Sequence, residues 1–92
     1  MTIATLNIAQ SMGVSEAELM HRALLTYLQE QRREVLKTRL NLLARYAVQS
    51  IDELEERIAD AEVPEHPAWE DLIIAENLGA RLEELDAYLG DL

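Results

Sequence analysis

The sequence predicts an all-α protein with a short N-terminal element, one long helix, a short helix and a final helix that folds back as a helical hairpin. Three observations predict this class. Apolar residues make up 49% of the chain and are nearly all aliphatic, with no Phe, three Tyr and one Trp. No Pro or Gly interrupts residues 15–46. Apolar residues recur at helical spacing in every long segment. The 92 residues are expected to form a single domain, 1–92.

A turn separates the first element, residues 1–14, from the long helix. Gly13 can end one element, Ser15 can cap the next helix, and Glu18 completes a capping box three residues later. The first element is either a strand or a short helix. The strand would place Thr5 and Asn7 on one side. The short helix would place three apolar residues on one side: Ala4, Ile8 and Met12.

Residues 15–47 are predicted to form one long helix. Its first 32 residues would span about 48 Å, whereas a compact domain of this size is roughly 30 Å across. No Pro or Gly offers a reason for a kink. The projecting part is therefore expected to lie against another chain. One apolar row runs along the helix through Met20, Leu24, Leu28, Val35, Leu42 and Tyr46.

A second apolar row appears after Val35, so the helix needs two neighbours: the returning chain and a second copy. The alternative is a single generous core around one monomer. The sequence thus predicts a homodimer paired, as in a coiled coil, along the long helices. Six residues are predicted at its interface: Leu28, Val35, Leu36, Leu40, Leu43 and Ala47.

The short helix is predicted over residues 50–61, with Ser50 as its cap and Glu53 as the capping-box partner. A linker leads to the final helix, predicted over residues 67–89. Pro67 suits its first position, where the missing N–H costs nothing. Six residues of this helix share one face: Ile74, Ala75, Leu78, Leu82, Leu85 and Leu89.

Three apolar residues at the start of the final helix lie away from this leucine row. Trp69 and Ile73 fall nearly opposite it, and Leu72 falls to one side. The sequence predicts that these three residues contact a partner protein. The alternative is that other parts of the same chain cover them.

Little chemistry is available in this composition. There is no Cys, and neither histidine, His21 or His66, lies in a metal-ligand pattern. No phosphate loop, nucleophile motif or dinucleotide fingerprint is present. We therefore expect no enzyme activity, cofactor, metal or small-molecule substrate. No apolar run approaches the roughly 18 residues of a membrane span, and we expect a soluble, cytoplasmic protein without membrane contact.

Charge is divided unevenly between the two halves of the chain. Residues 1–50 hold six Lys/Arg against four Asp/Glu, whereas residues 51–92 hold two Arg against fourteen Asp/Glu. The acidic back half excludes a protein that coats nucleic acid along its whole length. Any contact with DNA is expected from the front half.

Two parts of the chain carry a family resemblance. The stretch TLNIAQSMGVSEAELMHRALLTYL, Thr5 to Leu28, resembles the DNA-binding part of bacterial antitoxins and repressors of the ribbon-helix-helix kind. With the later stretches YAV-S-ELE and HPAWEDL-I-ENL, the chain resembles small antitoxin-like proteins of cyanobacteria and other bacteria. The agreement is best at nine positions: Gly13, Val14, Ser15, Glu18, Leu19, Arg22, Ala23, Leu24 and Leu28.

The resemblance implies a dimeric antitoxin-like interaction module of a toxin–antitoxin system. Its acidic half would engage a toxin-like protein, and its front half would regulate its own gene by contacting operator DNA through Thr5, Asn7 and Ser15. The sequence departs from the pattern because Ala9–Val14 is too short for the family's three-turn helix. Glu16 and Glu18 also oppose phosphate. The alternative is a structural or adaptor protein without DNA or toxin partners, which an isolated gene would favour.

Overall fold

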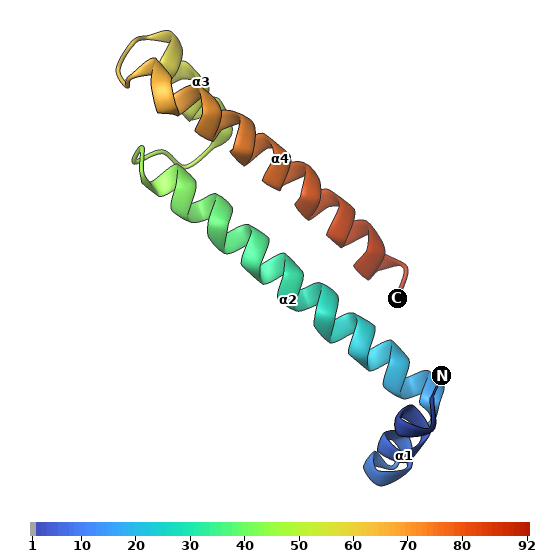
Figure 1. Ribbon diagram of the computed structural model, residues 1–92. Helices are drawn as coiled ribbons and strands as arrows, with labels where there is room; N and C mark the ends of the chain where they lie inside the picture. The colour runs from blue at the N-terminus through green and yellow to red at the C-terminus, as the bar shows by residue number, and fades with distance from the viewer. Residues whose placement is uncertain (1) are drawn as a thin grey trace.

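The computed structural model describes residues 2–92, and it contains four α-helices and no strand over that range (Figure 1). The helices are α1 (Ile3–Met12), α2 (Glu16–Ala44), α3 (Ile51–Ala59) and α4 (Glu65–Gly90). The all-α prediction is confirmed. The N-terminal element is a helix, so the strand alternative for residues 2–8 is wrong.

The molecule is elongated because α2 runs along most of its length. Its extents are 60 × 20 × 18 Å. Its radius of gyration is 19.4 Å, against about 12 Å for a compact domain of this size. Helix α4 lies antiparallel along the C-terminal part of α2, α3 lies at the closed end of this hairpin, and α1 lies at the opposite end (Figure 1). The long helix therefore projects beyond its own hairpin, as its length predicts.

The turn between α1 and α2 forms as its residue types predict. Gly13 ends α1 in the left-handed region at φ 73°, where the absence of a Cβ removes the strain. The Ser15 hydroxyl then accepts a hydrogen bond from the Glu18 N–H at 3.0 Å. The Glu18 carboxylate turns to Arg22 at 2.7 Å, so its main chain, rather than its side chain, takes part in the cap.

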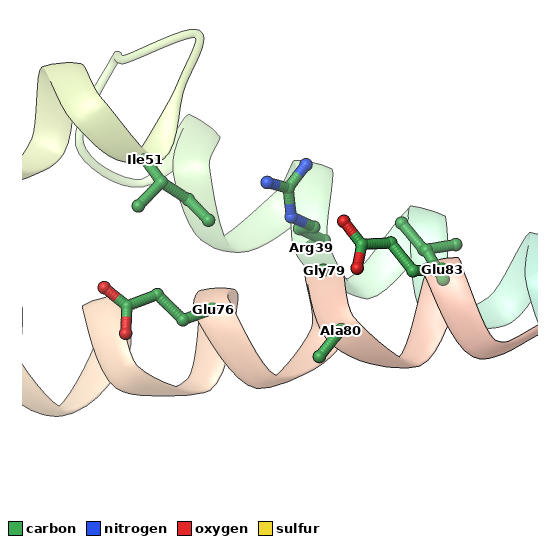
Figure 2. Close-up of a pocket in the computed structure, with 7 residues that line it drawn as sticks. Arg39, Ile51, Glu76, Gly79, Ala80 and Glu83 are labelled. Atoms are coloured by element: carbon green, nitrogen blue, oxygen red, sulfur yellow. The ribbon is translucent and has the colours of Figure 1, made fainter.

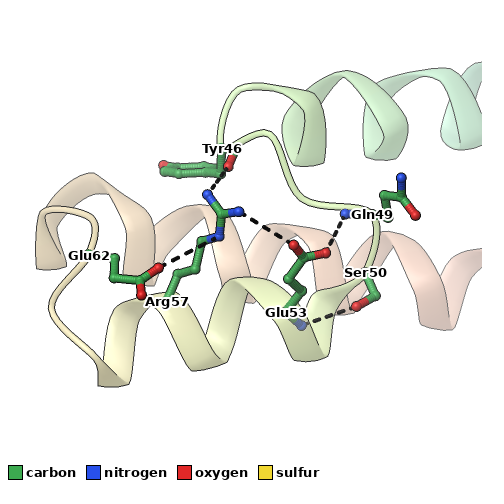
Figure 3. A network of polar contacts seen from close by, with 6 residues as sticks. All are labelled: Tyr46, Gln49, Ser50, Glu53, Arg57 and Glu62. Carbon is green, nitrogen blue, oxygen red and sulfur yellow. Dashed lines mark hydrogen bonds and ion pairs between the residues drawn. The ribbon is translucent and has the colours of Figure 1, made fainter.

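A polar network joins the end of α2 to α3 (Figure 3). The Ser50 hydroxyl accepts from the Glu53 N–H at 3.1 Å, and the Glu53 carboxylate accepts from the Gln49 N–H at 3.0 Å. Arg57 donates to the Tyr46 carbonyl oxygen at 3.2 Å and to the Glu53 carboxylate at 3.5 Å. The predicted cap at Ser50 therefore also orients the arginine that ties α3 back to α2.

The final helix begins and ends close to its predicted bounds. His66 has a non-helical backbone (φ −116°, ψ 132°), so the continuous helix begins at Pro67. Gly90 is its last residue, and Asp91 follows as the C-cap. Pro67 thus occupies the helical start that the sequence predicts.

The hydrophobic core lies at the closed end of the hairpin, where α2, α3 and α4 meet. Leu54 and Leu72 are its largest fully buried side chains, and Leu85, nearer the C-terminal end of α4, is also fully buried. Ile74, predicted on the leucine face, is 45% exposed, and Leu72 is buried instead. The core cluster consists of Leu42, Leu43, Val48, Leu54, Leu72 and Ala75, with Tyr46, Ile51 and Ile58 packed against it.

None of the helices within residues 2–92 combines the length and the apolar character that a membrane span requires.

Candidate interaction site

Residues 3–28 form an N-terminal arm, comprising α1 and the first part of α2, that lies beyond the hairpin (Figure 1). Helix α4 reaches α2 only as far as this boundary. Its last turns are held there by the ion pair between Arg32 and Asp86 at 2.7 Å, and Leu89 shares a shallow groove with Gln29 and Leu36. Most of the arm therefore lies beyond α3 and α4 (Figure 1).

Large apolar side chains are exposed along the whole arm. Helix α1 carries no charged residue, and the Glu18–Arg22 pair is satisfied within α2. Exposed apolar side chains in this number make the arm the candidate interaction site. The exposed fractions are Ile3 79%, Leu6 41%, Ile8 50%, Met12 69%, Met20 41%, Leu24 43% and Tyr27 61%.

The arm continues the side of α2 that is buried in the hairpin. Leu24 precedes Leu42 by 18 residues, about five turns, so the two side chains leave the helix in the same direction. Leu42 is 5% exposed and Leu24 is 43% exposed. One side of α2 is thus packed by the same chain at its C-terminal end and uncovered at its N-terminal end.

The predicted dimer residues fall in different surroundings. Leu43 is 2% exposed within the core of its own chain, so its assignment to an interface with another chain is wrong. The reason is that α4 packs directly over it. Leu40 and Ala47 are exposed, and three others are partly buried beside α4 or near its end: Leu28, Val35 and Leu36. The largest uncovered apolar surface lies in the arm.

The outer face of α4 carries two of the three residues predicted to contact a partner. Trp69 is 41% exposed and Ile73 is 53% exposed. Leu72 is 1% exposed and belongs to the core; its assignment to a partner surface is therefore wrong. Neighbouring positions on a helix point about 100° apart, which places Leu72 toward α2 while Ile73 points away.

Beside this face lies a groove between α2 and α4, of about 440 Å³, that we call the Arg39 groove. Figure 2 shows Arg39 beside Gly79, with Glu76 and Glu83 on the same stretch of α4. Arg39 Nε donates to the Ala75 carbonyl oxygen at 3.3 Å. A Cβ built on Gly79 would lie 3.5 Å from that Nε, so the small residue lets the guanidinium lie close against α4.

A buried polar pair connects the end of α2 to α4. The Tyr46 hydroxyl donates a hydrogen bond to the carboxylate of Asp71, which is 9% exposed. Burial, followed by this hydrogen bond, raises the pKa of Tyr46 to about 12. The sequence analysis missed this pair. A signal for the burial of Asp71, though not for its partner, was available, because Asp71 begins a heptad-spaced row continued by Ala75, Leu78, Leu82 and Leu85.

A comparison with models of protein families shows which family the chain belongs to. The model of the uncharacterized protein MJ0235 family matches residues 1–92. The chain belongs to this family. Neither a curated protein nor a solved structure matches it significantly.

In this MJ0235 family member, Thr5 and Ser15 lie near the starts of α1 and α2, and Asn7 lies in the middle of α1. Thr5 contacts Thr2 by a side-chain hydrogen bond of 3.1 Å. The Ser15 hydroxyl is engaged as the cap of α2. Asn7 is exposed on α1. Because residues 3–12 are helical, Thr5 and Asn7 cannot reach bases from a strand ribbon.

In this family member, the side chain of His66 forms one local contact. His66 Nδ1 lies 2.6 Å from the Glu70 carboxylate on the exposed first turn of α4. Hydrogen bonds from its own backbone N–H and from His66 lower the pKa of Glu70. Over residues 2–92, no cluster of three or more His, Asp or Glu side chains is placed to hold a metal ion. We therefore base the proposed function on the exposed apolar side chains of the arm and of α4.

Proposed function

We propose that this protein is a non-enzymatic interaction module that works as a homodimer paired through the N-terminal arm. The observation that carries the proposal is the uncovered apolar surface of residues 3–28. At roughly 200 Å² for a fully exposed large side chain, its seven exposed residues present about 750 Å² in total, divided between two sides of α1 and one side of α2. A standard interface buries about 800 Å² on each partner.

The charge distribution favours a second copy as the occupant of the arm. Helix α1 is uncharged, and the nearby part of α2 carries only Glu16, Glu18, His21 and Arg22. Two arms can therefore meet with little repulsion. Residues 51–92, with fourteen Asp/Glu against two Arg, would repel their own copy. Pairing through the arms keeps the two acidic hairpins at opposite ends of the assembly.

Light scattering at micromolar concentration tests the dimer. The wild-type protein should have twice the 10.5 kDa mass of one chain. Met20→Glu with Leu24→Glu should give the mass of one chain, because pairing would bury unpaired charges. The control, Thr26→Glu with Lys37→Gln, makes the same charge change at exposed positions on the opposite side of α2 and should stay dimeric. A monomeric wild type, or a dimeric Met20/Leu24 variant, would refute the proposal.

The antitoxin-like form of this proposal adds a toxin-like partner for the acidic half. The charge of residues 51–92 supports it, because a strongly acidic surface attracts a basic protein. The alternative is an adaptor without toxin or DNA. A short neighbouring reading frame that encodes a small basic protein favours the antitoxin role, and an isolated gene favours the adaptor.

Binding to operator DNA is tested separately from the dimer and from the toxin-like partner. The arm presents Glu16 and Glu18 beside the capped start of α2, and Arg22 is already paired with Glu18. Carboxylates repel phosphate, so we expect no sequence-selective complex with the protein's own promoter DNA, even at low salt. A gel-shift titration at two salt concentrations measures this. A selective complex that weakens as salt rises would instead support operator binding.

A further inference from the structure

We propose that the outer face of α4 docks a basic, amphipathic helical segment of another protein. Trp69 and Ile73 are four residues apart, so they lie on the same side of the helix. Both are exposed, at 41% and 53%. Ala80 is also exposed and continues the line two turns further on. This apolar row spans about 16 Å and faces away from the core.

Carboxylates border the row on both sides. Glu70 and Glu84 lie on one side, and Glu76 and Glu83 lie on the other. His66 Nδ1 lies 2.6 Å from the Glu70 carboxylate, and Arg81 forms an ion pair with Glu84 at 3.0 Å.

The carboxylates on the other side of the row, Glu76 and Glu83, line the Arg39 groove (Figure 2). Within residues 2–92, neither Glu76 nor Glu83 forms an ion pair. Arg39, the cation among the groove residues, donates to the Ala75 carbonyl oxygen. In the part of the chain that the structure describes, Glu76 and Glu83 therefore have no ion-pair partner, and the Arg39 guanidinium is the one positive charge that shares their groove.

Charge complementarity selects the occupant of this surface. A helix with a central apolar row flanked by Lys or Arg would cover Trp69 and Ile73 and place its cations against Glu76 and Glu83. Pairing of α4 with the α4 of a second copy does not fit, because both would carry the same carboxylates. An anionic membrane is disfavoured by the same repulsion. The inference rests on the proposed basic partner of residues 51–92 and names its contact surface, and it is independent of the proposed dimer, which uses the arm.

The probe for this surface is a synthetic peptide of Leu and Lys, with Leu at helical i, i+3, i+4 and i+7 spacing. A length of roughly 18 residues allows helix formation on binding. Because Trp69 is the single Trp of the chain, its emission reports binding without a label. We expect a blue shift on titration and an affinity that falls as salt rises. A peptide of the same composition with scrambled Leu positions is the control for amphipathicity.

Variants locate the contact. Ile73→Ser should weaken peptide binding by about tenfold or more, and Glu76→Gln with Glu83→Gln should weaken it and reduce its salt dependence. Glu55→Gln with Glu56→Gln removes two exposed carboxylates from α3 and should leave the affinity unchanged.

Equal loss in the α3 variant, or equal binding of the scrambled peptide, would show general attraction to an acidic protein and overturn the proposal. No change in Trp69 emission at any concentration would also overturn it.

Light scattering of the same samples separates the proposed peptide site on α4 from the proposed dimer through the arm. A monomeric protein that binds the peptide refutes the paired arms and supports this site, and a dimer that does not bind does the reverse.

Discussion

Leu72→Ala should lower the free energy of unfolding by about 2 to 5 kcal/mol, because it leaves a cavity in a packed core. Leu72 is 1% exposed and packs among residues of α2, α3 and α4. Urea denaturation followed by circular dichroism measures the change. The matched control is the next residue: Ile73 is 53% exposed, so Ile73→Ala should change stability by no more than about 0.5 kcal/mol.

This pair of variants tests the register of α4 against α2. Similar losses at the two positions would mean that Ile73 is covered as well as Leu72, and would contradict the outward direction of Ile73. A large loss at Leu72 alone leaves Ile73 available to a partner.

Tyr46→Phe should cost about 1 to 3 kcal/mol at neutral pH, because it leaves the buried carboxylate of Asp71 without its hydrogen-bond donor. Tyr88→Phe is the control. The Tyr88 hydroxyl also donates to a carboxylate, that of Glu84 at 3.1 Å, but both side chains are exposed. We expect a much smaller loss there. Equal losses from the two substitutions would contradict the role of the buried pair.

The same tyrosine makes stability depend on alkaline pH. The pKa of Tyr46 rises from 10.0 to about 12 in the folded protein, first through burial and then through its bond to Asp71. A raised pKa stabilises the fold fully below pH 10, and this contribution disappears as pH rises through about 12. Urea denaturation from pH 9 to 12 should therefore show a steeper loss for the wild type than for Tyr46→Phe. Parallel profiles would refute this linkage.

Local signals in the sequence predicted the helix boundaries well. Gly13, Ser15, Ser50 and Pro67 each act through their own backbone or through an N–H a few residues away. Their effect needs no knowledge of the rest of the fold. The length of α2 likewise predicted that it would project beyond the hairpin.

Which sides of α2 and α4 are buried depends on long-range packing, and the sequence predicted this less well. Leu43 and Leu72 lie on the margins of their apolar rows, and only the register between α2 and α4 decides that both are buried. Leu40 was predicted at the same interface as Leu43 but remains 54% exposed, because it lies outside the core cluster. The partnership of Tyr46 with Asp71 spans 25 residues and could not be assigned from spacing within either helix.

Helix α2 connects the N-terminal arm to the hairpin, and different interactions stabilise these two parts. Its C-terminal half is fixed by side chains from α3 and α4, so this part should fold and unfold cooperatively. In the arm, helical structure depends on two capped starts, on intrinsic helix propensity and on the limited packing of α1 against α2 around the buried Ala9, which together stabilise it less than a full core would. If two arms pair, their helical order becomes coupled to protein concentration while the hairpin remains folded. Damage to the arm would then abolish assembly without exposing the core, and the protein could lose its function while remaining folded.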